Sequence, residues 1–369
     1  MSGQWIGNFS GTNRGRAIVE LDDKGDHFEG NAYAFSDDPQ KLPSLVAWVR
    51  TPNKDPKFDL DLIVRPFVNG RMEDWEQIKA GFPGVTLSPQ LKTSWDFSGD
   101  DLRLTWTTPL GTNGTAQLLR LRASDPSQRK PIADVKSWSA FREFAASLEP
   151  RRFVFRGQQS SLWKLATAFH RHGRYDLMKF TSEDIPLLHG HLSGLTAHRF
   201  YLENDLENAA FHSLAQHHGY PTPLLDWTHS PYIAAFFAFR GVRKADQSAD
   251  KFVRIFVFDF NEWQADHARV QMLTLTPPHL TFLKALALNN PRMIPQQALS
   301  SVTNLNDIEN FIEWEERQRS KSYLRVIDLP TNERIRAMQE LAMMGITAGS
   351  LFPGLDGACE QMKEQNFEL

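Results

Sequence analysis

The hydrophobic pattern of this chain changes once, near residue 122, and that change limits the folds open to it. Before it, short runs of β-branched and aromatic residues alternate with clusters of Gly, Asp and Asn. After it, longer runs with helical spacing alternate with short apolar runs. The stretch between, 123–134, is polar and contains prolines, which is typical of a linker. We therefore expect an all-β domain at 1–122, a linker at 123–134 and a second domain at 135–369.

The first domain is expected to be an antiparallel sandwich or a small barrel, because its strand-length runs are joined by repeated turn residues. The runs expected to form strands are Arg16–Leu21, Phe28–Ala34, Leu62–Phe67, Leu102–Thr107 and Ala116–Leu121. Aromatic core packing is the favoured role for its tryptophans, and a lined pocket is the alternative. These tryptophans are Trp5, Trp48, Trp75, Trp95 and Trp106.

The second domain is expected to be α+β, with central strands flanked by helices. The expected helices are Val135–Ala146, His198–His218, Pro231–Arg240 and Asn332–Met344. The expected strands are Phe153–Phe155, Phe252–Phe260 and Tyr323–Leu329.

Composition narrows the function classes. A formal net charge of −3 argues against a dedicated nucleic-acid-binding protein. The single Cys359 excludes an internal disulfide, and no set of metal ligands at a recognised spacing is present, so no metal site is predicted. No apolar run approaches the ~20 residues that span a bilayer, and the N-terminus lacks a signal-peptide pattern, so we expect no membrane association and a cytoplasmic location.

The first block with chemical potential follows the short strand Phe153–Phe155. Arg156 at the end of a buried strand suits the gripping of a phosphate or carboxylate, and Gly157 allows a ligand or loop to approach the backbone. Gln158 and Trp163 follow as candidate ligand contacts. The alternative is a structural Arg156 paired with a carboxylate such as Asp226.

The second block runs from the end of one expected helix to the start of the next. Gly219 ends the first helix, and Ser230 caps the second, so the residues between them are interpreted as a loop that offers N–H groups to anions. Roles as ligand contacts and as structural residues stay equally open here. The candidates for ligand contact are His217, Thr222, Asp226 and Trp227.

The third block contains Arg292 and Gln296 between two apolar segments, where they order a nucleotide or tie a loop. Downstream, four glutamates crowd one segment, and a solvated acidic helix face is the favoured interpretation. These are Glu309, Glu313, Glu315 and Glu316. The pairs at His170/His172 and His189/His191 are interpreted as surface histidines.

Together the three blocks resemble the FRG domain family, named for the Phe-Arg-Gly signature. The resemblance rests on FRGQ at 155–158, on QHHGYPTPLLDWT at 216–228, and on the segments around Arg292 and Asp356, and it spans about 135–360. Pro223 stands where the family pattern implies Arg. The resemblance implies an α+β domain of a bacterial type but does not define an activity.

The layout is also similar to that of ADP-ribosyltransferases, in which a strand-borne basic residue and later polar segments frame NAD. That likeness implies NAD as a substrate, Arg156 on its phosphates or ribose, and Gln296 or Glu313 in a catalytic role. The chain would then act as a toxin or defence effector. No carboxylate is singled out by the sequence.

Two further hypotheses remain open. One is a non-catalytic signalling module that binds a nucleotide or another anionic ligand, with a protein partner recognised through the β-domain. The other is a structural scaffold in which Arg156 and Asp226 form a buried pair.

Overall fold

The first domain is a closed antiparallel barrel. In this computed structural model, which describes residues 1–283 and 286–368, the strands follow the order β4-β3-β2-β1-β9-β8-β7-β5, and β4 also pairs with β5. Closure removes the exposed sheet edges that an open sheet would leave. The barrel strands are β1 (Gly3–Gly11), β2 (Gly15–Asp23), β3 (Phe28–Ser36), β4 (Ser44–Arg50), β5 (Lys57–Val68), β7 (Gln90–Ser98), β8 (Asp101–Thr107) and β9 (Asn113–Arg120), with β6 (Arg71–Met72), α1 (Trp75–Ile78) and the turn η1 (Lys79–Gly81) beside them.

The barrel was expected as one of two all-β alternatives, and all five of the expected strands are present. Strands β1, β4 and β7 were not expected. In β1 and β7, Gly, Ser or Lys separate the apolar residues, so their strand character comes from pairing with neighbours on both sides, whereas β4 is a short apolar run that sequence reasoning missed.

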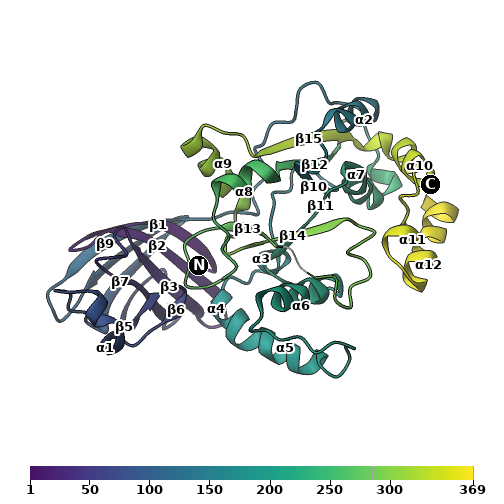
Figure 1. The fold of residues 1–369 in the computed structure, drawn as a ribbon. Helices are drawn as coiled ribbons and strands as arrows, with labels where there is room; N and C mark the ends of the chain where they lie inside the picture. The colour runs from purple at the N-terminus through teal and green to yellow at the C-terminus, as the bar shows by residue number, and fades with distance from the viewer. Residues whose placement is uncertain (284–285, 369) are drawn as a thin grey trace.

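The second domain mixes helices with an antiparallel sheet of order β13-β14-β11-β10-β12-β15 among the described residues. The strands are β10 (Phe153–Gln158), β11 (Leu224–Thr228), β12 (Phe252–Asp259), β13 (Leu280–Leu283), β14 (Ala298–Thr303) and β15 (Leu324–Pro330). Figure 1 shows this sheet to one side of the barrel, with the helices around it.

Helices cover both faces of this sheet. On one face, α2 (Trp138–Ser147), α7 (Pro231–Arg240) and α10 (Arg334–Met343) contribute to one buried cluster. On the other, α8 (Phe260–Asp266) and α9 (Ile308–Arg319) pack on Trp227 and Phe258. The remaining helices and helical turns are α3 (Ala168–Arg171), α4 (Leu177–Lys179), η2 (Phe180–Asp184), α5 (Ile185–Leu192), α6 (Asp205–His217), η3 (Lys244–Asp246), η4 (Thr331–Glu333), α11 (Ala348–Leu351), α12 (Leu355–Lys363) and η5 (Glu364–Glu368).

Two expectations for this domain were wrong. The helix expected from His198 begins at Asp205, because the Asn204 side chain caps the N–H groups of Leu206 and Glu207. The segment interpreted as a loop between Gly219 and Ser230 contains strand β11, which pairs with β14 and β10 near the middle of the sheet. Helix α7, in contrast, has the bounds expected from its Ser230 cap and Pro231.

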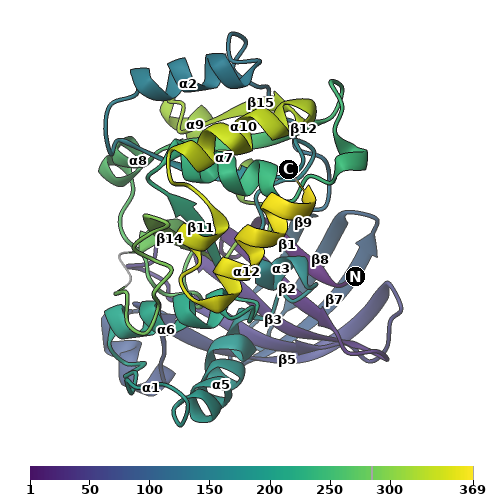
Figure 2. The same ribbon diagram turned by 90° about the vertical axis from the view of Figure 1, so that its right-hand side faces the viewer.

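The outer wall of the barrel docks on the second domain. Ile18 and Tyr33 point out of the barrel, yet they are buried with Met178 of α4 and with Leu275. Figures 1 and 2 show strands β1–β3 facing this side. No helix of the described residues is long and apolar enough to cross a bilayer.

Candidate functional site

A cavity of about 1130 Å³ opens in the second domain next to the barrel junction. Its walls come from strands β10 and β11, helix α3 and the loop before β14. Residues 120–125, which leave the barrel, close one side. The three blocks singled out in the sequence therefore meet at one place, although they are far apart along the chain.

Arg156 occupies the centre of this cavity. Its Nη1 donates to the backbone carbonyl of Asp226 at 2.7 Å, and its Nε has no partner among the described residues. Burial lowers the pKa of Arg156 to about 10, so the guanidinium stays charged at neutral pH. In place of the ion pair with the Asp226 carboxylate that was the structural alternative, Arg156 makes a hydrogen bond to the Asp226 backbone, and the nearby Asp226 charge partly offsets the effect of burial on the Arg156 pKa.

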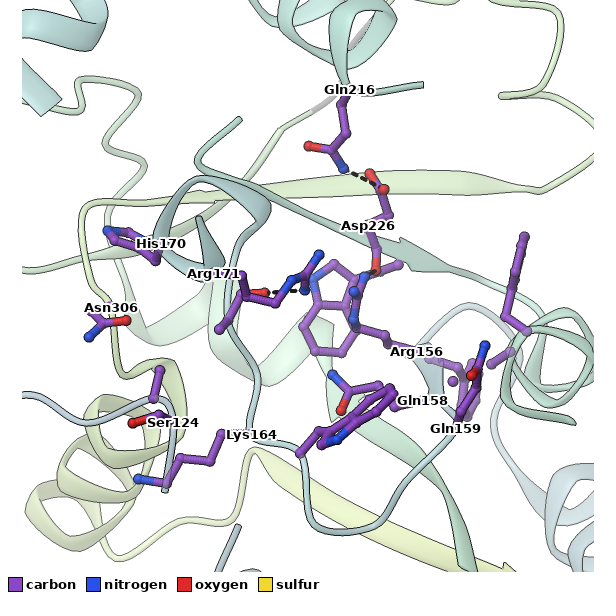
Figure 3. Close-up of a pocket in the computed structure, with 18 of the residues that line it drawn as sticks. Ser124, Arg156, Gln158, Gln159, Lys164, His170, Arg171, Gln216, Asp226 and Asn306 are labelled. Carbon is purple, nitrogen blue, oxygen red and sulfur yellow. Dashed lines mark hydrogen bonds between the residues drawn. The ribbon is translucent and has the colours of Figure 1, made fainter. Parts of the chain in front are cut away.

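Arg171 and Arg292 add two further guanidinium groups to the lining. Arg171 donates to the carbonyl of Ala166 at 2.8 Å, and Arg292 donates to that of His217 at 3.1 Å. Desolvation lowers the pKa of Arg171. Figure 3 shows Arg156 and Arg171 extending from opposite sides into the same space. Neither these two nor Arg292 forms an ion pair with a carboxylate within 1–283 and 286–368.

The lining is rich in positive charge overall. Its acidic members are Asp125 and Asp226, and its basic members are Arg120, Arg122, Arg156, Lys164, Arg171 and Arg292. Lys164 is neutralised by Asp307 at 2.7 Å, and Arg122 by Asp100 at 2.8 Å. The charge available to a ligand is therefore concentrated on the four lining arginines that have no ion pair with a carboxylate of the described residues, which are Arg120, Arg156, Arg171 and Arg292.

The Asp226 carboxylate is held by a chain of polar side chains. Gln216 of α6 donates to Asp226, and the hydroxyl of buried Thr222 donates in turn to Gln216. Ser300 of β14 approaches the other carboxylate oxygen at 3.4 Å. Figure 3 shows the Gln216 contact above Asp226. These three uncharged side chains hold the Asp226 carboxylate in place and supply no charge that would neutralise it.

Besides Arg156 Nε, two further buried polar atoms at the cavity have no partner among the described residues. They are Oε1 of Gln158 and Nε2 of His170. Desolvation lowers the pKa of His170 to about 3, so its ring is neutral, and its Nδ1 lies 2.8 Å from the Thr167 hydroxyl. A buried polar atom left unpaired is costly, and a ligand offering a donor and an acceptor would satisfy both.

The structure brings most of the predicted site residues together. Those that line the cavity are Arg156, Gln158, Trp163, His217, Asp226, Trp227, Arg292 and Gln296. Trp163 is 55 % exposed at the rim. Trp227 is buried in the core beneath, where its Nε1 donates to Ser301 at 2.9 Å, and Gln296 donates to the carbonyl of Leu351 at 3.0 Å.

Two predicted residues lie elsewhere. Thr222 is fully buried behind the wall and reaches the cavity only through Gln216. Glu313 lies on α9 outside the cavity, half exposed, and pairs with Arg317. This position separates Glu313 from Arg156, the residue with which it was expected to act.

Sequence reasoning missed Arg171, Gln216 and His170. His170 and His172 were interpreted as surface histidines, and for buried His170 this was wrong. The Thr167 cap predicts a short helix that contains the consecutive residues His170 and Arg171, but no pattern in the sequence shows that α3 packs beside β11. The explanation for glycine at position 157 also differs from the expected one, because helix α7, and not a ligand, approaches its backbone.

The fold and the cavity define a two-domain protein in which a closed β-barrel is joined to an α+β domain with a basic pocket. Residues 151–247 of that second domain match the FRG domain family, so this is an FRG domain-containing protein. The match covers β10, β11, α7 and the elements between them, a shorter range than the resemblance at 135–360.

Among solved structures, a redesigned β-barrel is similar to 33 % of this chain over 91 % of its own length, with 12 % identity and a TM-score of 0.24. No curated protein matches the chain.

Proposed function

We propose that the FRG domain cavity binds a phosphorylated, nucleotide-sized anion. The observation that carries this proposal is the convergence of Arg156, Arg171 and Arg292 without carboxylate partners. Guanidinium groups bind phosphate oxygens through paired, charge-assisted hydrogen bonds. A bound phosphate offsets the desolvation that lowers the pKa of Arg156 and Arg171.

The rest of the lining supports a nucleotide over a bare phosphate. The volume of about 1130 Å³ exceeds the need of one phosphate group. Exposed Trp163 at the rim offers an aromatic face for a base, and such stacking contributes about 1–3 kcal/mol per base in nucleic-acid binding. The unpaired Gln158 and His170 atoms offer directional contacts to a ribose or base edge.

The test is titration calorimetry of the purified full chain with ADP, ADP-ribose, NAD and uncharged adenosine. Arg171→Gln is expected to weaken binding of the phosphorylated ligands by about tenfold or more, since a hydrogen bond to a charged group is lost. Arg317→Gln on the surface of α9 is the matched control and should leave binding unchanged. Adenosine binding as tightly as ADP, or no binding of any phosphorylated ligand, would refute the proposal.

A second candidate function is cleavage of NAD, and the position of Asp226 favours it. The backbone carbonyl of Asp226 accepts from Arg156, and its carboxylate, on a residue that lines the same cavity, is oriented by Gln216. In such a reaction the bond between ribose C1′ and the pyridinium nitrogen breaks, and its electron pair leaves with nicotinamide. A fixed carboxylate stabilises the positive charge that develops on the ribose before the acceptor attacks C1′.

Nicotinamide release from NAD tests this second candidate. Wild-type protein should release nicotinamide, and Asp226→Asn should reduce the rate by about a hundredfold or more while NAD binding persists. Glu313→Gln, which alters a residue outside the cavity, should keep the wild-type rate. Tight NAD binding without nicotinamide release, even in cell extract, would refute this second candidate and leave only the binding function.

A further inference from the structure

The interior of the barrel is packed unevenly along its axis. At the end that holds the N-terminus, large side chains fill the space, and Trp5, Leu21 and Leu102 are almost completely buried. Toward the other end, neighbouring strands place small residues at inward positions. These inward alanines are Ala17, Ala32, Ala34, Ala47 and Ala116.

The alanines leave a cavity of about 140 Å³ inside the barrel. Inward Ala32 and Ala34 of β3 keep some solvent exposure, whereas outward Tyr33 between them is buried against the second domain. In a filled barrel the inward residues would be buried and the outward residue exposed, and here the opposite is found. The cavity therefore opens toward solvent at the end formed by the β1–β2 turn and the β3–β4 loop.

The cavity wall is apolar and aromatic. Phe9, Trp95 and Trp106 contribute rings, and no charged side chain is among its lining residues. The hydroxyl of Thr93 is already engaged, because it accepts from Trp95 Nε1 at 2.8 Å and donates to the carbonyl of Leu60 at 3.0 Å. A ligand inside would find no ion-pairing group and would lose the hydration of any charge it carried.

We propose that the barrel is a second binding site, which takes a small uncharged aromatic or aliphatic molecule of about one ring. The size matches, since an engineered apolar cavity of about 150 Å³ holds benzene. An eight-stranded barrel is just wide enough either to be filled by its own side chains or to hold one small ligand. The small inward alanines leave room for a ligand in this barrel. The aromatic rings suit edge-to-face contact with an aromatic guest.

The site is independent of the basic cavity, because the two share no lining residue. The barrel wall that carries Ala32 and Ala34 also carries Tyr33, which contacts the second domain.

Calorimetric titration of the full chain with toluene tests the proposal, and benzoate serves as the charged analogue. Toluene should bind saturably at one site, and benzoate should bind at least about tenfold more weakly. Ala34→Leu fills the cavity near its mouth and should weaken toluene binding by about tenfold or more, with an unchanged or higher melting temperature. Ala32→Leu provides the same test should Ala34→Leu fail to fold.

Gln117→Leu is the matched control, because Gln117 is the exposed neighbour of Ala116 on β9. It should bind toluene as the wild type does, and so should Arg171→Gln, which alters the other cavity. Absence of saturable toluene binding, equal binding of benzoate, or unchanged binding by both cavity-filling variants would overturn the proposal.

Discussion

Gly157 illustrates how a residue of the signature motif serves packing as well as the site. A Cβ atom at this position would lie 1.9 Å from the carbonyl oxygen of Ala234 and 2.7 Å from the nitrogen of Ala238. Only a residue without a side chain lets helix α7 approach strand β10 so closely. That approach aligns β10 and thereby sets the position of Arg156 beside it.

Gly157→Ala is expected to lower the free energy of unfolding by about 3 kcal/mol or more, because a backbone contact cannot yield as a side chain can. Gly190→Ala is the matched control, since Gly190 lies in α5 with open space around it. That substitution should be neutral or should stabilise by up to about 1 kcal/mol. Urea denaturation of both variants checks the pair, and equal effects would contradict the packing explanation.

Helix α9 is the element whose role differs most from expectation. Its glutamates were interpreted as a solvated acidic face, and for Glu309 and Glu315, which are buried, this was wrong. Glu309 accepts from the backbone N–H of Leu165 at 2.8 Å and from the Ser127 hydroxyl at 2.6 Å. Desolvation raises the pKa of Glu309. The helix therefore anchors the segment that leaves the barrel.

Glu316 of the same helix pairs with Arg129 at 2.8 Å and accepts from the N–H groups of Tyr323 and Leu324 at the start of β15. Glu316→Ala is expected to destabilise the protein by about 3 kcal/mol, because Arg129 and two N–H groups lose their partner. Glu313→Ala on the exposed side should cost no more than about 0.5 kcal/mol. Thermal denaturation distinguishes the two, and similar costs would refute the anchoring role.

At the scale of the whole molecule, the barrel and the FRG-containing domain are joined by buried polar groups on outward positions of β2. Asp22 accepts from Arg174 Nε at 2.6 Å and from backbone N–H groups of Tyr175 and Asp176. Glu20 is fully buried nearby, and Gln4 donates to it at 2.9 Å. Desolvation raises the pKa of Glu20 well above 4.5, with the charge on Asp176 adding to the effect.

This raised pKa makes the domain junction sensitive to pH. The folded protein binds the Glu20 proton more tightly than the unfolded chain does, so the free energy of unfolding falls as pH rises from about 4.5 through the folded-state pKa. Glu20→Gln should therefore raise the denaturation midpoint at pH 8, and its advantage should shrink as the pH is lowered toward 4.5. A gain that does not vary with pH would contradict burial of the charge as the cause.

Local signals in the sequence were enough to predict the bounds of α7 and five barrel strands. Each depends on residues within a few positions of one another, such as the Ser230 cap and its Pro231. Strand ends and turn residues also marked the blocks that contain Arg156, Asp226 and Arg292, and these three residues line one cavity. The resemblance to the FRG family likewise depended chiefly on two short motifs, at 155–158 and 216–228.

Tertiary structure alone decided which of these local pieces meet. Residues 224–228 are a strand because β14 pairs with them, and Glu309 is buried because Ser127, 182 residues away, folds over it. Arg171 comes close to Arg156 only because α3 packs beside β11. Glu313 lies outside the cavity because it is on the outward side of α9. Burial, counter-charges and barrel closure depend on contacts between distant segments, and no periodicity or cap along the chain encodes those contacts directly.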